Sequence, residues 1–117
     1  MPKQNYQNKN WVEEKKKQHW FFDGRLTYFV SEIMDGLNID SLDEIAIALN
    51  RAFQACEILQ LPIYRNFKRV YRFDGENMIA DWKISALACY LVIINCNPGN
   101  ENVAKAQLYF AMNKVAH

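Results

Sequence analysis

A nearly apolar run from Ile84 to Ile94 limits the folds open to this chain more than any other segment. The run is interrupted early by Ser85. A membrane-spanning helix needs about 20 apolar residues, so this run is too short to cross a bilayer. A helix that is apolar on all sides is instead typical of the centre of a domain. We therefore predict a buried helix over Trp82–Asn95, with Asp81 as its N-cap.

A turn signal follows the apolar run, because residues 96–100 read Cys-Asn-Pro-Gly-Asn. Asn100 is a suitable N-cap for a last helix, which we expect over residues 101–116. We expect the two helices to pack together as an apolar helical hairpin at the centre of the domain. The contact face of the last helix is then formed by Val103, Ala106 and Phe110.

Cap and turn signals divide the rest of the chain into short elements. Asp-Gly pairs at 23–24 and 74–75 each lie between aromatic or branched residues, which is typical of β-hairpins. The first hairpin would place its second strand at residues 26–28. Ser41 begins a capping box, and the apolar spacing after it predicts a helix over Leu42–Glu57. Ser31 and Pro62 suit the starts of two further short helices. We therefore predict an α+β domain of about five helices with one or two small β-hairpins.

The 117 residues are enough for one domain with its own core. Residues 1–18 are rich in Asn, Gln and Lys, so we expect a flexible, basic arm before a single domain over residues 19–117. The arm lacks the apolar segment of a secretion signal. Cys56, Cys89 and Cys96 are odd in number and lack C-x-x-C spacing, which favours reduced thiols and a cytoplasmic location.

The sequence contains no pattern typical of a catalytic, metal or cofactor site. His19 and His117 are almost a whole chain apart, whereas a zinc site needs clustered ligands. Glycine-rich phosphate-binding loops are also missing from the sequence. We therefore expect a non-enzymatic protein with no metal and no cofactor.

The C-terminal third resembles a known family. The matching residues are Ala88-Cys89-Tyr90-Leu91-Val92, then Asn95 and Asn97-Pro98, then Val103-Ala104-x-Ala106-Gln107-x-Tyr109-Phe110-Ala111. This pattern is similar to that of the DNA-damage-inducible protein D family, which is related to the BRO N-terminal domains of phage antirepressors. The likeness covers roughly residues 20–112 in all and is weak in its upstream half. The family usually has a further C-terminal region, which we expect this chain to lack.

The resemblance implies a protein linked to a prophage or to the SOS response that acts on DNA transactions. The BRO relatives are similar to nucleic-acid-binding domains, and the resemblance brings no catalytic residues. Within the motif, the candidates for a functional role are the polar residues Tyr90, Asn95, Gln107 and Tyr109. We expect them to be structural, with the amides bonded to backbone groups of the turn and the tyrosine hydroxyls at the rim.

A basic segment is the best candidate for binding a partner. Residues 61–72 contain no acidic residue, and alternate residues of a strand point to the same side, where they can meet successive phosphates. Two tyrosines in the segment could stack on unpaired bases. The alternative is an ordinary solvated surface. The candidate nucleic-acid-binding residues are Arg65, Lys68, Arg69, Arg72, Tyr64 and Tyr71.

Two functions therefore stay open at the level of sequence. The first is a regulator of DNA transactions that binds nucleic acid through the basic surface. The alternative is a protein-interaction module that inhibits a host DNA-repair, defence or repressor protein, which the near-zero net charge of +1 favours. The partner would be nucleic acid in the first case and a host or phage protein in the second. Homo-oligomers are compatible with both, and a membrane partner is not expected.

Overall fold

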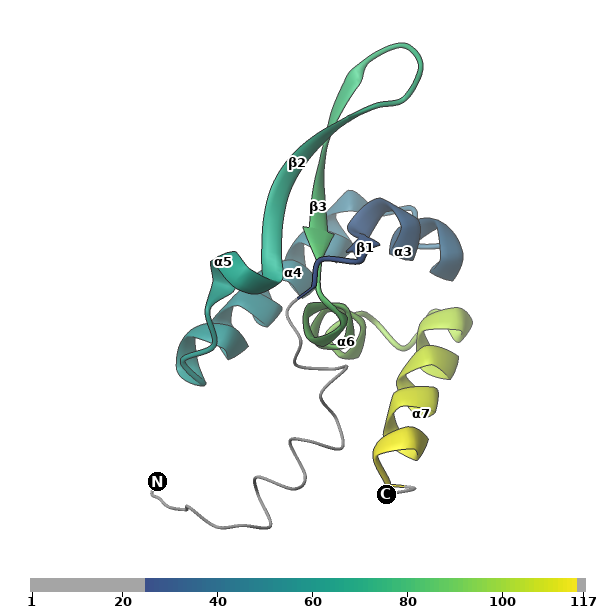
Figure 1. Ribbon diagram of the computed structural model, residues 1–117. Coiled ribbons are helices and arrows are strands. Elements are labelled where there is room, and N and C mark those ends of the chain that lie inside the picture. Colours follow the sequence, from purple (N-terminus) through teal and green to yellow (C-terminus); the bar gives the residue numbers. More distant parts are fainter. Residues whose placement is uncertain (1–24, 116–117) are drawn as a thin grey trace.

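The computed structural model describes residues 25–115, and it confirms the α+β prediction. This part of the chain has five helices and one three-stranded antiparallel sheet (Figure 1). The expected arm over residues 1–18 lies outside the described residues. The elements are β1 (Tyr28–Phe29), α3 (Val30–Leu37), α4 (Leu42–Ile58), α5 (Ile63–Asn66), β2 (Phe67–Phe73), β3 (Met78–Ile84), α6 (Ala86–Ile94) and α7 (Glu101–Val115).

The predicted hairpin around Asp74 is confirmed, and it is the most prominent feature of the molecule. Strands β2 and β3 pair along their whole length, from Phe67 opposite Ile84 to the last pair before the turn. The Asp74 carboxylate accepts hydrogen bonds from the backbone N–H groups of Glu76 and Asn77. Gly75, which lies between Asp74 and Glu76, has a positive φ of 104° that favours glycine. The far half of the hairpin rises clear of the helices (Figure 1).

The other predicted hairpin is described only in part. Its Asp-Gly turn at residues 23–24 lies outside the described residues. The strand expected at residues 26–28 is observed as β1, which begins two residues later and ends one residue later, and it pairs with the end of β3. Tyr28 is opposite Ile84 and Phe29 is opposite Lys83, so β3 lies between β1 and β2.

The predicted start of the central helix is wrong. Trp82 and Ile84 belong to β3, and Asp81 does not cap a helix. Ser85 is the N-cap of α6, because its Oγ accepts a hydrogen bond of 3.1 Å from the N–H of Ala88. The apolar residues at positions 82–84 suit a buried strand as well as a buried helix, and pairing with two neighbouring strands decides for the strand.

One further predicted cap is wrong, and the predicted capping box forms only in part. The helix α3 begins at Val30 with Phe29 as its N-cap, so Ser31 lies within the first turn, and its hydroxyl bonds to a carboxylate of β3 instead. Ser41 does cap α4 and accepts from the N–H of Glu44 at 3.2 Å. The Glu44 carboxylate, however, accepts from the N–H of Asn97, which ties α4 to the turn after α6.

The core is built around α6, which Figure 1 shows nearly end-on below the sheet. Ala48 and Ala52 on α4 and Ala88 on α6 are fully buried, and these small side chains let the two helices approach closely. The last helix packs on α6 through the predicted face. In that face Val103 is fully buried, and Ala106 and Phe110 are partly buried against the core.

Candidate nucleic-acid interface

The β2–β3 hairpin separates the predicted basic residues onto its two faces. Successive side chains of a strand alternate between faces, and residues opposite each other in an antiparallel pair share a face. Lys68 and Arg72 therefore lie on one face, whereas Arg69 and Tyr71 lie on the other. The register adds Lys83, which sequence reasoning missed, to the first set. We call Lys68, Arg72 and Lys83 the basic face.

Two lysines of the basic face are direct neighbours. Lys68 on β2 is opposite Lys83 on β3 in the register of the hairpin. Like charges directly opposite each other destabilise a sheet. Within residues 25–115, no carboxylate lies within ion-pairing distance of either ammonium group. The pair is therefore a concentration of positive charge that an anion would relieve.

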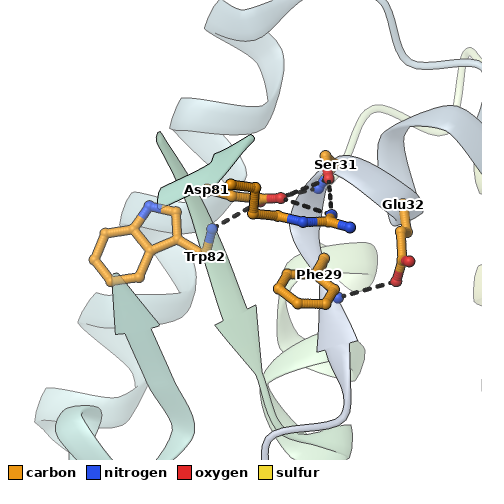
Figure 2. Close-up of polar contacts among 6 residues, drawn as sticks. Phe29, Ser31, Glu32, Asp81 and Trp82 are labelled. Atoms are coloured by element: carbon orange, nitrogen blue, oxygen red, sulfur yellow. Dashed lines mark hydrogen bonds and ion pairs between the residues drawn. The ribbon is translucent and has the colours of Figure 1, made fainter. Parts of the chain in front are cut away.

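The third cation of the basic face is held by a buried carboxylate. Arg72 Nη1 lies 3.2 Å from Asp81 Oδ2 and 3.1 Å from Ser31 Oγ. The Ser31 hydroxyl in turn donates to Asp81 Oδ2 at 2.6 Å, and the Ser31 N–H donates to Oδ1 (Figure 2). This network joins α3 to the hairpin and fixes the guanidinium, whose side chain is still 40% exposed.

An aromatic ring completes the basic face. Phe29 is opposite Lys83 in the β1–β3 register, and its ring lies 3.8 Å from the Arg72 guanidinium carbon and 5.6 Å from Lys83 Nζ. Both distances are within the range of a cation–π attraction. Phe29 therefore helps to hold two cations side by side. Neither Phe29 nor Lys83 belongs to the basic segment of the sequence, so its composition gave no signal for them.

Despite burial, the hydrogen bonds of this network lower the pKa of Asp81. Burial raises the pKa of the carboxyl, but hydrogen bonds from Ser31, from the Trp82 N–H and from Arg72 outweigh burial and leave the pKa below its usual value. The ionised carboxylate therefore stabilises the folded chain. This contribution is complete above the pKa of Asp81 in the unfolded chain, about 3.9, and is lost as the pH falls through the lower pKa of the folded state.

We therefore expect the wild-type protein to lose more stability than an Asp81→Asn variant when the pH falls from about 6 to about 3. The variant cannot ionise at this position, so the difference between the two proteins isolates Asp81 from Asp74, whose pKa is also lowered. Urea unfolding at each pH measures the effect. Equal losses in the two proteins would contradict the assigned role.

The remaining predicted residues lie apart from the basic face. The Arg69 guanidinium carbon is 5.0 Å from the centre of the Trp82 indole, on the opposite face of the hairpin. Tyr71 is on that same face. Tyr64 and Arg65 are exposed on the short helix α5, before the hairpin begins. The six predicted residues therefore do not form one continuous surface.

The motif residues of the C-terminal third make structural contacts. Gln107 Nε2 donates to the carbonyl oxygens of Ile93 and Cys96, at 2.9 and 3.0 Å. Asn95 Nδ2 donates to the Leu91 carbonyl oxygen at 2.7 Å. Among the tyrosines, the ring of Tyr90 packs edge-on against Phe110, and so does the ring of Tyr109, which is largely exposed.

A cleft of about 530 Å³ lies between the start of α4 and the turn after α6. Two of its polar side chains are already occupied, since Ser41 caps α4 and Glu44 accepts from the Asn97 N–H. Cys96 also lines the cleft, and burial, followed by the charge of Glu44, raises the pKa of its thiol to about 11. A thiol with this pKa is not a nucleophile at neutral pH.

Residues 25–115 contain neither a metal-binding cluster nor a membrane-spanning helix. No three side chains of His, Cys, Asp and Glu type within residues 25–115 are close enough together to hold a metal ion. In the same part of the chain, no helix has both the length and the apolar character needed to cross a membrane.

The candidate site combines side chains from all three strands of the sheet. Its cations come from β2 and β3, its aromatic ring comes from β1, and the carboxylate that anchors it lies in the middle of the hairpin. Comparison of the chain with protein-family models, with curated proteins and with solved structures gives no match.

Proposed function

We propose that this chain is a non-enzymatic regulator of DNA transactions, associated with a prophage or with the SOS response, that binds nucleic acid through its basic face. The observation that carries the proposal is the Lys68–Lys83 pair, in which two ammonium groups share one face without a carboxylate partner within the described residues. Phosphate groups along a nucleic-acid backbone would relieve this repulsion. The resemblance of the C-terminal third to the DNA-damage-inducible protein D family supports the same function.

The shape of the hairpin also supports backbone recognition. The far half of the ribbon projects from the helical body (Figure 1). Arg72 lies toward that half, so a nucleic acid can reach this end of the basic face without meeting the helices, whereas Lys68 is exposed at the base of the ribbon. Phosphate contacts position a protein on nucleic acid without selecting a sequence. We therefore expect binding with little sequence preference. The free thiols of Cys56, Cys89 and Cys96 support a cytoplasmic location.

A salt titration tests the proposal. The logarithm of the binding constant for duplex DNA is expected to fall linearly with the logarithm of salt concentration, by about 0.9 for each phosphate neutralised. The double variant Lys68→Glu, Lys83→Glu should reduce that slope by about 2 and weaken binding at low salt by at least about tenfold. Fluorescence anisotropy of a labelled duplex measures both quantities.

The matched control reverses two cations elsewhere. Arg51→Glu with Lys105→Glu makes the same change in net charge on α4 and α7. The control variant should keep the wild-type slope, because the cations it alters are not on the hairpin. If the wild type does not bind at low salt, or if both double variants bind equally, the proposed function is wrong.

One observation favours the alternative, a module that inhibits a host protein. The helix α7 exposes Leu108, Tyr109 and Met112, which are 59%, 64% and 61% exposed. Exposed apolar patches mark sites of protein contact. If this function holds, Leu108→Ser with Met112→Ser should abolish capture of a host DNA-repair or repressor protein, whereas the Lys68→Glu, Lys83→Glu variant should retain capture. A clean negative with the wild type would count against it.

A further inference from the structure

The hairpin carries a second unusual surface on the side opposite the basic face. Tyr71, Phe73 and Met78 are 66%, 67% and 63% exposed, and the register places all three on one face together with the small side chain of Ala80. None of the described helices covers this far half of the ribbon (Figure 1). We call these four residues the apolar face. A patch of this kind on a two-stranded ribbon, which is itself marginally stable in water, is typical of a contact site.

The two ends of the apolar face carry opposite charges. Arg69 lies at the end near the helices, exposed and stacked on Trp82. Asp74 and Glu76 lie in the turn at the other end and are exposed. Hydrogen bonds from the backbone N–H groups of Asn77 and Glu76 lower the pKa of Asp74, so the turn is negatively charged at neutral pH. The ribbon is therefore positive at its base and negative at its tip.

We propose that a second copy of this chain covers the apolar face, with the two hairpins packed face to face and antiparallel. A twofold axis at the level of the Arg72–Ile79 pair would bring the Arg69 side chain of each copy to the acidic turn of the other. Opposite charges then meet at both ends of the contact. Such a self-complementary patch is what a symmetric dimer requires.

The same axis matches the apolar side chains. It sets Tyr71 of each copy against Phe73 of the other, and Met78 against Ala80. These pairs follow from the register, in which Tyr71 is opposite Ala80 and Phe73 is opposite Met78. The aromatic pair gains the attraction typical of offset or edge-on rings. The large Met78 side chain meets the smallest side chain of the face, so the two ribbons can interdigitate.

The expected dimer is weak and is independent of nucleic acid. Each large side chain is about two-thirds exposed and can bury on the order of 100–150 Å² more. A contact built on six of them then buries roughly 600–900 Å², below the roughly 1,200 Å² at which standard stable interfaces begin. The basic faces point outward on opposite sides of the dimer. Dimer formation therefore does not rest on the proposed function and can be measured without nucleic acid.

Sedimentation of the full chain at about 1–500 µM tests the proposal. The wild type should show a monomer–dimer equilibrium with a Kd of roughly 10–100 µM. Phe73→Ser should raise the Kd at least about tenfold, because it removes an aromatic side chain from the centre of the contact. Ile79→Ser is the matched control on the other face of the same ribbon and should keep the wild-type Kd. Circular dichroism confirms that both variants are folded.

A charge exchange gives the decisive result. Arg69→Glu and Glu76→Lys should each weaken dimerisation alone, because the first brings like charges together at the ends of the contact and the second leaves the turn with no net charge. An equimolar mixture of the two variants should dimerise better than either variant alone, because one end of the mixed pair then has Arg69 against an unaltered acidic turn. A wild type that stays monomeric at about 500 µM, or a mixture that associates no better than either variant alone, would overturn the proposal. A monomer that binds single-stranded DNA in a Phe73-dependent manner would also overturn it and would assign the face to base stacking.

Discussion

Replacing Ile84 with alanine is expected to lower the free energy of unfolding by about 2–5 kcal/mol, the range for deleting a buried isoleucine side chain. Ile84 is fully buried and lies where three strands meet, opposite both Tyr28 and Phe67. Its carbonyl oxygen also accepts from the Thr27 N–H. The truncation leaves a cavity between β1 and β2 that the side chains of these strands cannot fill. A domain is stable by only about 5–15 kcal/mol, so this loss is a large share of the total.

The control for this prediction lies on the same strand. Ile79 is 48% exposed on the far half of the hairpin, and Ile79→Ala makes the same change in side-chain volume. We expect this variant to lose less than about 1 kcal/mol. Urea unfolding, with the midpoint and slope fitted separately, compares the two variants. Similar losses in both would show that Ile84 is not at the centre of the core.

The elements that the sequence predicts best are those with local signals. The turn of the second hairpin follows from Asp74-Gly75, because the carboxylate bonds the next two N–H groups and the glycine has a positive φ. The start of α4 follows from Ser41 in the same way. Each signal depends on atoms within three residues, so no knowledge of the rest of the fold is needed.

The start of α6 shows where local signals are not enough. The segment from Trp82 to Ile84 has the apolar character of the helix that follows, and a short apolar run does not separate strand from helix. The strand is chosen by contacts from distant segments, with Arg69 opposite Trp82 and Tyr28 opposite Ile84. Ser85 then becomes the cap. The error therefore came from tertiary pairing, which a single sequence does not reveal.

The sequence predicted which segment carries the positive charge of the candidate site, but not which residues share one face. The density of cations around Lys68 gives a correct indication of positive charge, but the alternation of a strand divides those cations between two faces. Lys83 on β3 and Phe29 on β1 lie outside the basic segment of the sequence. They join the basic face only through the register of the sheet. The salt bridge from Arg72 to Asp81 likewise depends on the register of the hairpin.

Replacing Ser85 with alanine is expected to cost about 2–3 kcal/mol of stability, more than an ordinary helix cap contributes. The Ser85 hydroxyl is 1% exposed and makes two hydrogen bonds, accepting from the Ala88 N–H at 3.1 Å and donating to Asn66 Oδ1 at 2.7 Å. The substitution leaves a donor and an acceptor unpaired in a buried site. Each such group carries a desolvation penalty that water cannot relieve.

Ser41→Ala is the matched control for Ser85→Ala, because Ser41 caps α4 through the same bond at an exposed position. Water can replace the lost acceptor there, so the expected loss is about 1 kcal/mol or less. Thermal and urea unfolding of both variants measure the difference. The buried cap should cost at least about twice as much as the exposed one. If the order is reversed, the Asn66–Ser85 bond does not stabilise the junction between the hairpin and the central helix, because its loss would then carry no penalty beyond that of the cap.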